Sequence, residues 1–596
     1  MSFYDDSSLV VIPSGYKTSK VYAEKPTDGS GDLAFTRTGD TATRVNSAGL
    51  VEKVRTNLIL QSQTFDNASW AKSNITVTAN TTVAPDGTTT ADTFVSLGVT
   101  SEHAVRATTS MAVNTEHTAS VYVKRTNTRY AYIRDLTNNT VAIYDLQDGV
   151  VSLSAGTSTS ITAVGSFYRI STTFVTPAVI VNNLIDLGIT TSPSSLSSLV
   201  PVNDTMVFWG AQLETGVLTD YIPTTTAAVS VGPVANVPRL DYLGSSCPRL
   251  LLEPQRQNLV TFSEQINNAA WVQEQVTITA NATTSPDGTI NADKVIANAT
   301  AGDKYVAQIF TVGIGNAFTT SAYFKSSEYT YAFIRFGGLV SNPYVIYNLA
   351  TQAVVTTSGL TSSSITSVGN GWYRITATVT STTTTIAPVL MVIPSTGYTL
   401  GADNIPEFTG NGTSGGFIWG AQLEAGAYAT SYIPTLSASA TRGADAASKT
   451  GISSLIGQTE GTLFMDVNKT LRTDSPVRLN ISDGTASNWI FIGLQTDNSP
   501  ILYVITAGST VANITSIALS SGRHKIAGAY KNNDFVLYVD GVQIGTDTSG
   551  GVGATSRFQY GGNYIDTGAE TDSLTNQILL FKTRLTNAEL ATLTTL

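Results

Sequence analysis

The stretch Trp209-Gly-Ala-Gln-Leu-Glu214, which runs on to Tyr221-Ile-Pro-Thr224, decides the organisation of the chain because it occurs twice. The second copy, Trp419-Gly-Ala-Gln-Leu-Glu424, runs on to Tyr432-Ile-Pro-Thr435. Earlier matches follow the same order, and Trp70 lies as far before Trp271 as Asp92 lies before Asp293. Both separations are 201 residues (271 − 70 and 293 − 92). A repeat of this length indicates duplication of a whole domain, because solenoid and propeller units repeat every ~20–50 residues.

The composition favours strands joined by polar turns. Only 13% of the 596 residues are charged, where about 25% is usual, and Thr, Ser, Asn, Gly and Val take their place. The chain is still 42% hydrophobic, with 6 Trp, 25 Tyr and 20 Phe, which is enough apolar material to argue against disorder. We therefore predict a nearly all-β protein.

Charge and cysteine content exclude several classes of function. The formal net charge is −10 and no basic block is present, so we predict no nucleic-acid partner. A single cysteine, Cys247, excludes an internal disulfide framework and a four-cysteine zinc site. The start of the chain lacks a basic, apolar leader and no later stretch is long enough to span a bilayer, so we predict cytoplasmic synthesis and no membrane insertion.

The strand patterns and turn clusters predict five regions. Alternating runs such as Thr118–Lys124 and its counterpart Thr320–Lys325 predict two antiparallel sheets packed face to face in each copy. The capping box Thr586-Asn-Ala-Glu589 predicts a short helix near the end of the chain. The regions are an N-terminal virion-docking segment, a first jelly-roll module, an ordered linker arm, a second jelly-roll module and a third, differently organised sandwich, over 1–56, 57–225, 226–257, 258–445 and 446–596.

Several of these motifs resemble a known class of protein. The pieces Arg55-Thr-Asn-Leu58 and Arg256-Gln-Asn-Leu259, the Asn-Ala-x-Trp pieces and the Trp-Gly-Ala-Gln-Leu-Glu endings are similar to modules of tailed-bacteriophage virion proteins, usually called tail or head fibre proteins. The C-terminal block, with Tyr538-Val-Asp-Gly541 and Leu585–Leu590, resembles the concanavalin A-like (laminin-G-like) lectin fold. The resemblance implies carbohydrate-binding-module-like jelly rolls in homo-oligomeric appendages on a virion. The predicted fold class is therefore all-β, with tandem β-sandwich (jelly-roll) domains plus a concanavalin A-like sandwich.

This resemblance leads to a prediction of function. We expect a non-enzymatic structural protein of a phage virion, made in the bacterial host cytoplasm and displayed on the virion surface for attachment to the host. Its expected partners are other virion proteins, host-surface glycans and further copies of itself, as a trimer or alternatively a dimer, because linked weak sites multiply avidity. The alternatives are a capsid or tail decoration protein with a purely structural role and, third, a polysaccharide depolymerase.

Tryptophans are the first candidates for sugar contact, because an aromatic face covers the apolar face of a pyranose ring. Trp70, Trp271, Trp209 and Trp419 recur in both copies and favour core positions, with sugar stacking as the alternative. Trp372 stands where the first copy has Phe167, and Trp489 lies beside polar residues. We therefore predict a carbohydrate site with Trp372 and Trp489 as exposed platforms and with hydroxyl recognition by Arg374 and Asn488.

Repeated acidic turns suggest a metal site. Pro85-Asp-Gly-Thr88 with Asp92 recurs as Pro286-Asp-Gly-Thr289 with Asp293. Asp86, Asp92, Asp287 and Asp293 predict a structural calcium site, since calcium takes several oxygen ligands. The alternative is a plain tight turn in which Gly takes a positive φ. No other cofactor is expected.

Catalytic motifs are not found in the sequence. The three histidines, His103, His117 and His524, do not form a known zinc motif, and no nucleophile elbow, P-loop or dinucleotide fingerprint is present. We therefore predict no enzymatic activity. A glycosidase needs only two suitably spaced carboxylates, so the depolymerase alternative stays open among 43 acidic residues.

Overall fold

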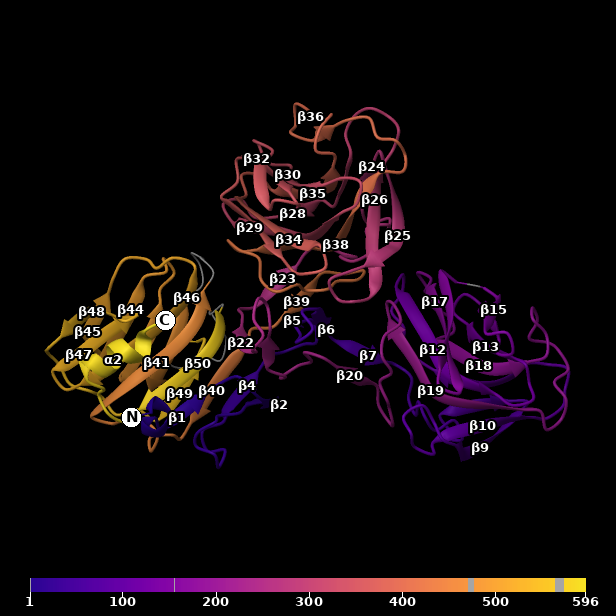
Figure 1. The fold of residues 1–596 in the computed structure, drawn as a ribbon, viewed down its shortest axis with the longest axis horizontal. Helices are drawn as coiled ribbons and strands as arrows, with labels where there is room; N and C mark the ends of the chain where they lie inside the picture. The colour runs from indigo at the N-terminus through magenta and orange to yellow at the C-terminus, as the bar shows by residue number, and fades with distance from the viewer. Residues whose placement is uncertain (1, 155, 470–475, 563–572) are drawn as a thin grey trace. The chain divides into compact units, whose positions relative to one another are not determined.

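The computed structural model describes residues 2–154, 156–469, 476–562 and 573–596, and nearly all of its regular structure is strand (Figure 1). In these residues the helices are α1 (Phe3–Asp6) and α2 (Asn587–Thr594), and no helix there is long and apolar enough to cross a membrane. The predicted capping box at Thr586 and Glu589 is present. The predicted fold class, all-β with tandem β-sandwiches, is confirmed.

The chain forms two compact units that do not follow sequence order. One unit is Val54–Gly232, and the other combines Met1–Lys53 with Pro233–Leu596. The first module is thus an insertion between two segments, 1–53 and 233–596, that together form the other unit. Strands β7 (Arg55–Asn57) and β20 (Val229–Val231) pair and bring the two ends of the insert together.

The first module is a sandwich of two antiparallel six-stranded sheets. Successive side chains of a strand point to opposite faces, so on β12 (Glu116–Arg125) Ala119, Val121 and Val123 enter the core while Tyr122 and Lys124 lie on the outer face. The sheet that contains β12 has the order β16 (Ser158–Val164), β17 (Phe167–Val175), β12, β19 (Thr205–Thr215), β10 (Ala91–Ser96), β9 (Ile75–Thr82). The opposite sheet has the order β15 (Val150–Leu153), β14 (Thr140–Asp145), β13 (Tyr130–Asp135), β18 (Leu184–Thr190), β11 (His103–Thr108), β8 (Trp70–Ser73).

The second module repeats this topology and adds the short strand β28. Tyr122 pairs with Arg169 in the first module and Tyr323 pairs with Arg374 in the second, so Phe167 and Trp372 occupy equivalent positions. The sheet that matches the one with β12 has the order β33 (Ser362–Ser367), β34 (Trp372–Thr380), β29 (Ala317–Ser326), β38 (Gly415–Ala425), β26 (Ile290–Ala297), β25 (Val276–Thr284). The opposite sheet has the order β24 (Val272–Glu274), β27 (Tyr305–Ala307), β35 (Thr385–Ile393), β30 (Tyr331–Gly337), β31 (Tyr344–Asn348), β32 (Ala353–Ser358), with β28 (Phe310–Thr311) also paired to β35.

The C-terminal sandwich is built from three separate parts of the chain. Its eight-stranded sheet has the order β21 (Arg239–Asp241), β22 (Arg249–Leu252), β50 (Ser573–Phe581), β41 (Glu460–Lys469), β46 (Gly522–Lys531), β47 (Asp534–Val539), β48 (Val542–Asp547), with β1 (Leu9–Val11) also paired to β50. Its nine-stranded sheet has the order β2 (Tyr16–Lys17), β3 (Lys20–Val21), β4 (Leu33–Thr36), β40 (Ala446–Thr450), β49 (Arg557–Tyr560), β42 (Val477–Ser482), β43 (Trp489–Leu494), β44 (Pro500–Thr506), β45 (Ser509–Thr515). Strands β1 to β4 of the predicted virion-docking segment therefore belong to the chain's own C-terminal sandwich, and the predicted linker arm supplies β21 and β22 to it.

A buried charge cluster joins these parts. Arg239 Nη1 lies 2.6 Å from Glu253 Oε2, Arg442 Nη1 lies 2.9 Å from the same oxygen, and Arg37 Nη1 lies 3.2 Å from Asp445 Oδ1. Burial alone raises the pKa of the Glu253 carboxyl, but the Arg442 and Arg239 guanidinium groups outweigh it and hold the pKa well below its usual range. Removal of one member leaves an uncompensated buried charge, which costs about 3–5 kcal/mol. The cluster therefore fixes the N-terminal segment, the linker and the exit of the second module to one another.

Candidate functional site

The first module carries an aromatic cluster outside its core. Phe167 and Trp209, both 3% exposed, lie on the outer face of the sheet that contains β12, together with Tyr122 and Tyr221. Gly210, the second residue of the repeated motif, has a φ of +64°, and a Cβ there would lie 3.1 Å from the Tyr122 ring and 3.4 Å from the Tyr221 ring. The pairing of β12 with β19 also shifts register at this point. The glycine thus allows a bulge in which both tyrosines approach the strand closely.

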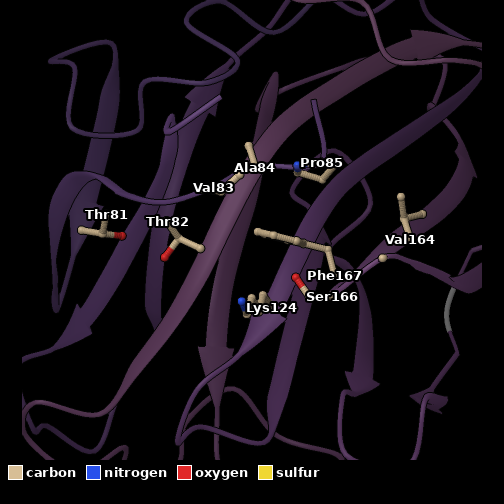
Figure 2. A pocket seen from close by; sticks show the side chains of 10 residues that line it. Thr81, Thr82, Val83, Ala84, Pro85, Lys124, Val164, Ser166 and Phe167 are labelled. Carbon is tan, nitrogen blue, oxygen red and sulfur yellow. The ribbon is translucent and has the colours of Figure 1, made fainter. Parts of the chain in front are cut away.

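An open hollow lies beside this cluster, and we call it the outer-face hollow (Figure 2). It has a volume of about 590 Å³. Its wall comes from the end of β9 with the loop after it, from β12, and from the turn between β16 and β17. The lining residues are Thr81, Thr82, Val83, Ala84, Pro85, Lys124, Val164, Gly165, Ser166 and Phe167.

The lining combines an apolar floor with hydroxyl groups and one cation. Figure 2 shows Phe167 in the middle of the group, with Lys124 and Ser166 on one side and Val83 to Pro85 on the other. Lys124 Nζ lies 5.8 Å from the centroid of the Phe167 ring. None of the ten lining residues is acidic, and no ion pair of Lys124 is found in the part of the chain that the structure describes. The hollow can therefore present a positive charge next to an apolar surface.

The equivalent place in the second module is filled by the larger side chain of Trp372. Its indole Nε1 donates a hydrogen bond of 2.9 Å to the carbonyl oxygen of Thr284, at the end of β25. Phe167, at the same position in the first module, has no N–H group to make such a bond. In the second module Trp372 therefore connects β34 to the end of β25. In the first module the equivalent walls, the start of β17 and the end of β9, line the outer-face hollow.

A segment from the N-terminal region completes this closure. We call it the plug segment and define it as Leu50–Lys53. It includes β6 (Val51–Lys53), which pairs with β5 (Thr43–Val45). Val51 is 5% exposed and belongs to the cluster of Trp372, Trp419 and Tyr323. Its backbone N–H donates to the carbonyl oxygen of Pro286 over 2.9 Å. The aromatic face of the second module is thus covered by the chain itself.

Lys53 anchors the plug segment through ion pairs with the buried Asp287 and the half-buried Glu264. Its Nζ lies 2.9 Å from Asp287 Oδ2 and 2.5 Å from Glu264 Oε2. Burial alone lowers the pKa of the Lys53 ammonium group, but the Asp287 and Glu264 carboxylates raise it to about 12. Burial alone raises the pKa of Asp287, but Lys53 and the hydrogen bonds from Thr289 hold it well below its usual range. In the first module Gln63 replaces Glu264, and Asp86, the counterpart of Asp287, is exposed.

The prediction that Trp372 is exposed in the second module is wrong. Trp372 is only 1% exposed, because the β25 end and the plug segment cover it. Arg374 donates to Ser321 Oγ over 2.9 Å, and its guanidinium carbon lies 5.5 Å from the centroid of the Tyr323 ring. Both side chains therefore support the outer face of the sheet.

The predicted platform in the C-terminal sandwich is also covered. Trp489 is 9% exposed and stacks on Phe491, with ring centroids 4.9 Å apart. Asn488 donates to Asp483 Oδ2 over 2.8 Å and accepts from the backbone N–H of Ala507 over 3.0 Å, so it holds a turn. Trp489 lies on β43 and Trp372 lies on β34. The predicted pair Trp489 with Asn488 and the predicted pair Trp372 with Arg374 therefore belong to different sheets.

The predicted calcium ligands hold turns through backbone amides. Asp92 accepts from Phe65 and Asn80 over 2.8 and 2.9 Å, and Asp293 accepts from Asn281 over 2.9 Å. The exposed Asp86 accepts from the backbone N–H of Thr88 over 2.9 Å. Within the described residues no group of three or more acidic, His or Cys side chains is arranged for a metal ion. The arrangement does not fit calcium and matches the tight-turn alternative, with Gly87 and Gly288 both at a φ of +84°.

The four repeated tryptophans occupy buried positions, as predicted. Trp70 and Trp271 lie in the main cores of their modules, and Trp209 and Trp419 lie in the outer-face clusters. The hollow beside Trp209 was not predicted from the sequence. The available signal was the alternation on β12, which places Lys124 on the same face as Tyr122.

Comparison with known proteins identifies no family. No known protein family and no curated relative matches the sequence. The chain is similar to a carbohydrate-binding module, CBM40, of the Ruminococcus gnavus IT-sialidase, at 15% identity over 24% of this chain and 91% of that one, with a TM-score of 0.22. It is also similar to the CBM22-1–CBM22-2 tandem domain of Paenibacillus barcinonensis Xyn10C, at 11% identity over 62% of this chain and 98% of that one, with a TM-score of 0.21.

The NanB sialidase of Streptococcus pneumoniae is a further similar structure, at 13% identity and a TM-score of 0.22, and the match covers 24% of this chain and only 26% of the sialidase. The structural neighbours thus include carbohydrate-binding modules. At these TM-scores the alignments do not assign the chain to a family, and the fold described above rests on its own strand pairing.

Proposed function

We propose that this protein is a non-catalytic glycan-binding protein that uses the first module for contact. The observation that carries the proposal is the outer-face hollow, where the exposed side chains of Val83 and Pro85, the hydroxyl groups of Thr82 and Ser166 and the ammonium group of Lys124 surround the buried ring of Phe167. Binding sites for small ligands are concave, largely apolar and equipped with a few polar groups that fix orientation. An apolar sugar face and its hydroxyl groups match this lining.

The setting proposed for this activity is the surface of a phage virion. The support is the resemblance of the repeated Trp-Gly-Ala-Gln-Leu-Glu endings and the Arg-x-Asn-Leu pieces to phage tail or head fibre proteins. The protein is then a structural appendage that attaches to host-surface glycan, in association with other virion proteins. A homo-oligomer, a trimer or alternatively a dimer, raises avidity by linking weak sites, and sedimentation equilibrium of the purified chain measures its size.

The test is to incubate the purified full chain with surface polysaccharide of host cells and to follow two readouts. Retention of the protein on the polysaccharide measures binding, and the size distribution of the polysaccharide measures cleavage. We expect retention without shortening. Shortened chains would mean that the protein is a depolymerase.

A purely structural decoration protein is the second candidate. The closed aromatic face of the second module favours it, because Trp372 and the plug segment use that face for packing within the chain. Absence of retention over a broad set of glycans, together with normal folding, would select this candidate over the glycan-binding protein.

A further inference from the structure

We infer that the outer-face hollow of the first module is specific for a saccharide unit that carries a carboxylate. This inference rests on the proposed glycan binding and adds the chemical class of the ligand. Its basis is the position of one charge, the Lys124 ammonium group, which lies over the buried Phe167 ring in the wall of the hollow.

The charge at Lys124 is available to a ligand. Its side chain is half-buried, which lowers the entropy lost when it is fixed, and no carboxylate of the described residues pairs with it. Other cations of the same module are engaged: Arg106 pairs with Asp186 over 2.6 Å and Arg129 pairs with Asp145 over 2.5 Å. Hydrogen bonds between an ammonium group and a carboxylate are about twice as strong as neutral ones. An anionic group at Lys124 is therefore the polar contact that this lining supports best.

The rest of the lining selects a sugar instead of a small free anion. The exposed side chains of Val83 and Pro85 face Phe167 across the hollow and offer a surface for the apolar face of a ring. Hydroxyl groups of Thr82 and Ser166 lie on two different walls, where they can meet ring hydroxyls. A volume of about 590 Å³ also exceeds what an inorganic anion needs and suits one or two sugar units.

The second module supports this assignment by contrast. Lys325 is the counterpart of Lys124, and its Nζ lies 6.0 Å from the centroid of the Trp372 ring. There Val51 packs into the cluster of Trp372, and the indole bonds to the carbonyl oxygen of Thr284, so this position is used for packing within the chain. The pair Lys124 and Lys325 therefore forms a matched test and control within one chain.

The experiment measures binding of the full chain to polygalacturonate, to hyaluronate and to the carboxyl-reduced form of each. We expect binding to at least one acidic polymer and a loss of at least about tenfold on its carboxyl reduction. Lys124→Gln should lower the affinity for the acidic polymer by about tenfold or more, while Lys325→Gln leaves it unchanged. Phe167→Trp, which introduces the bridge seen in the second module, should abolish binding; circular dichroism and thermal unfolding establish that each variant is folded.

The outcomes separate this inference from the proposed function. Equal binding to the acidic and reduced polymers would overturn the carboxylate inference and leave glycan binding intact. Absence of binding to every polymer here, together with absence of retention on host polysaccharide, would overturn both. Competition by inorganic phosphate as effective as that by galacturonate, at matched ionic strength, would show a general anion site and overturn the saccharide assignment.

Discussion

The two modules share topology, motif and aromatic cluster, yet one has an open outer face and the other has a closed one. Phe167 and Trp372 occupy equivalent strand positions, but only the indole reaches across to a backbone carbonyl. The second module is also covered by the plug segment, whereas the described residues of the insert 54–232 include no such cover over the hollow. Duplication thus produced one face that packs within the chain and one that carries an open hollow.

The largest expected effect comes from removal of the charge that anchors the plug segment. Lys53→Met leaves the buried Asp287 and the half-buried Glu264 without their cation and should lower the free energy of unfolding of its unit by about 3 kcal/mol, the lower end of the range for a buried pair. The measurement is urea unfolding with a probe for each unit, since a protein of several domains does not unfold in one two-state step.

The first module supplies the control for this change. Lys124→Met removes a half-buried cation without an acidic partner in the described residues, so we expect a change within about 0.5 kcal/mol. An equal loss for the two variants would contradict the view that the outer face of the second module depends on a paired lysine, Lys53, whereas that of the first module does not depend on Lys124.

A smaller effect is expected when the apolar contact of the plug segment is reduced. Val51→Ala removes two methyl groups from the cluster of Trp372, Trp419 and Tyr323 and should cost about 2 kcal/mol. The matched change beside the open hollow, Val83→Ala, affects a side chain that is 57% exposed and should cost less than about 0.5 kcal/mol. Thermal unfolding of the two variants compares the packing of the two faces directly.

The duplication, the fold class and the final helix could be predicted because they depend on local patterns. Alternation along β12 and its counterpart β29 predicted strands, and Thr586 with Glu589 predicted the cap. The burial of Trp372 could not be predicted from local patterns. Its exposure depends on Val51, which lies hundreds of residues earlier and whose position is set by long-range pairing.

The same limit applies to the C-terminal sandwich. Strand β1 pairs with β50, and β4 pairs with β40, across almost the whole length of the chain. No local pattern at Leu9–Val11 or Leu33–Thr36 identifies these partners. The sequence did indicate that this segment needs another structure to pack on, since it is too short for a core of its own.

Acid should weaken the closed face in a way that depends on Asp287. The pKa of this carboxyl is lowered in the folded state, so its contribution to stability is present above the usual value of about 3.9 and is lost as the pH falls through the lower folded value. We therefore expect the stability difference between wild type and Asp287→Asn to be large at pH 7 and to shrink below about pH 4, by at most about 1.4 kcal/mol per pH unit.

The exposed counterpart Asp86 provides the control for this pH profile. Asp86→Asn should change stability by less than about 0.5 kcal/mol at each pH. Urea unfolding at several pH values measures both variants, and a difference for Asp287→Asn that stays constant into strong acid would rule out the proposed ion pair with Lys53.

The smallest expected effect is that of metal removal, and here the two modules should behave alike. Asp92 and Asp293 direct their oxygens to backbone N–H groups in equivalent turns, so a cation would have to displace hydrogen bonds that the fold already makes. We expect EDTA, and calcium added after it, to leave the unfolding temperature of both units unchanged. A rise with calcium in only one unit would locate a metal site there and would mean that the two turns, unlike the two aromatic faces, differ in a way that their hydrogen bonds do not reveal.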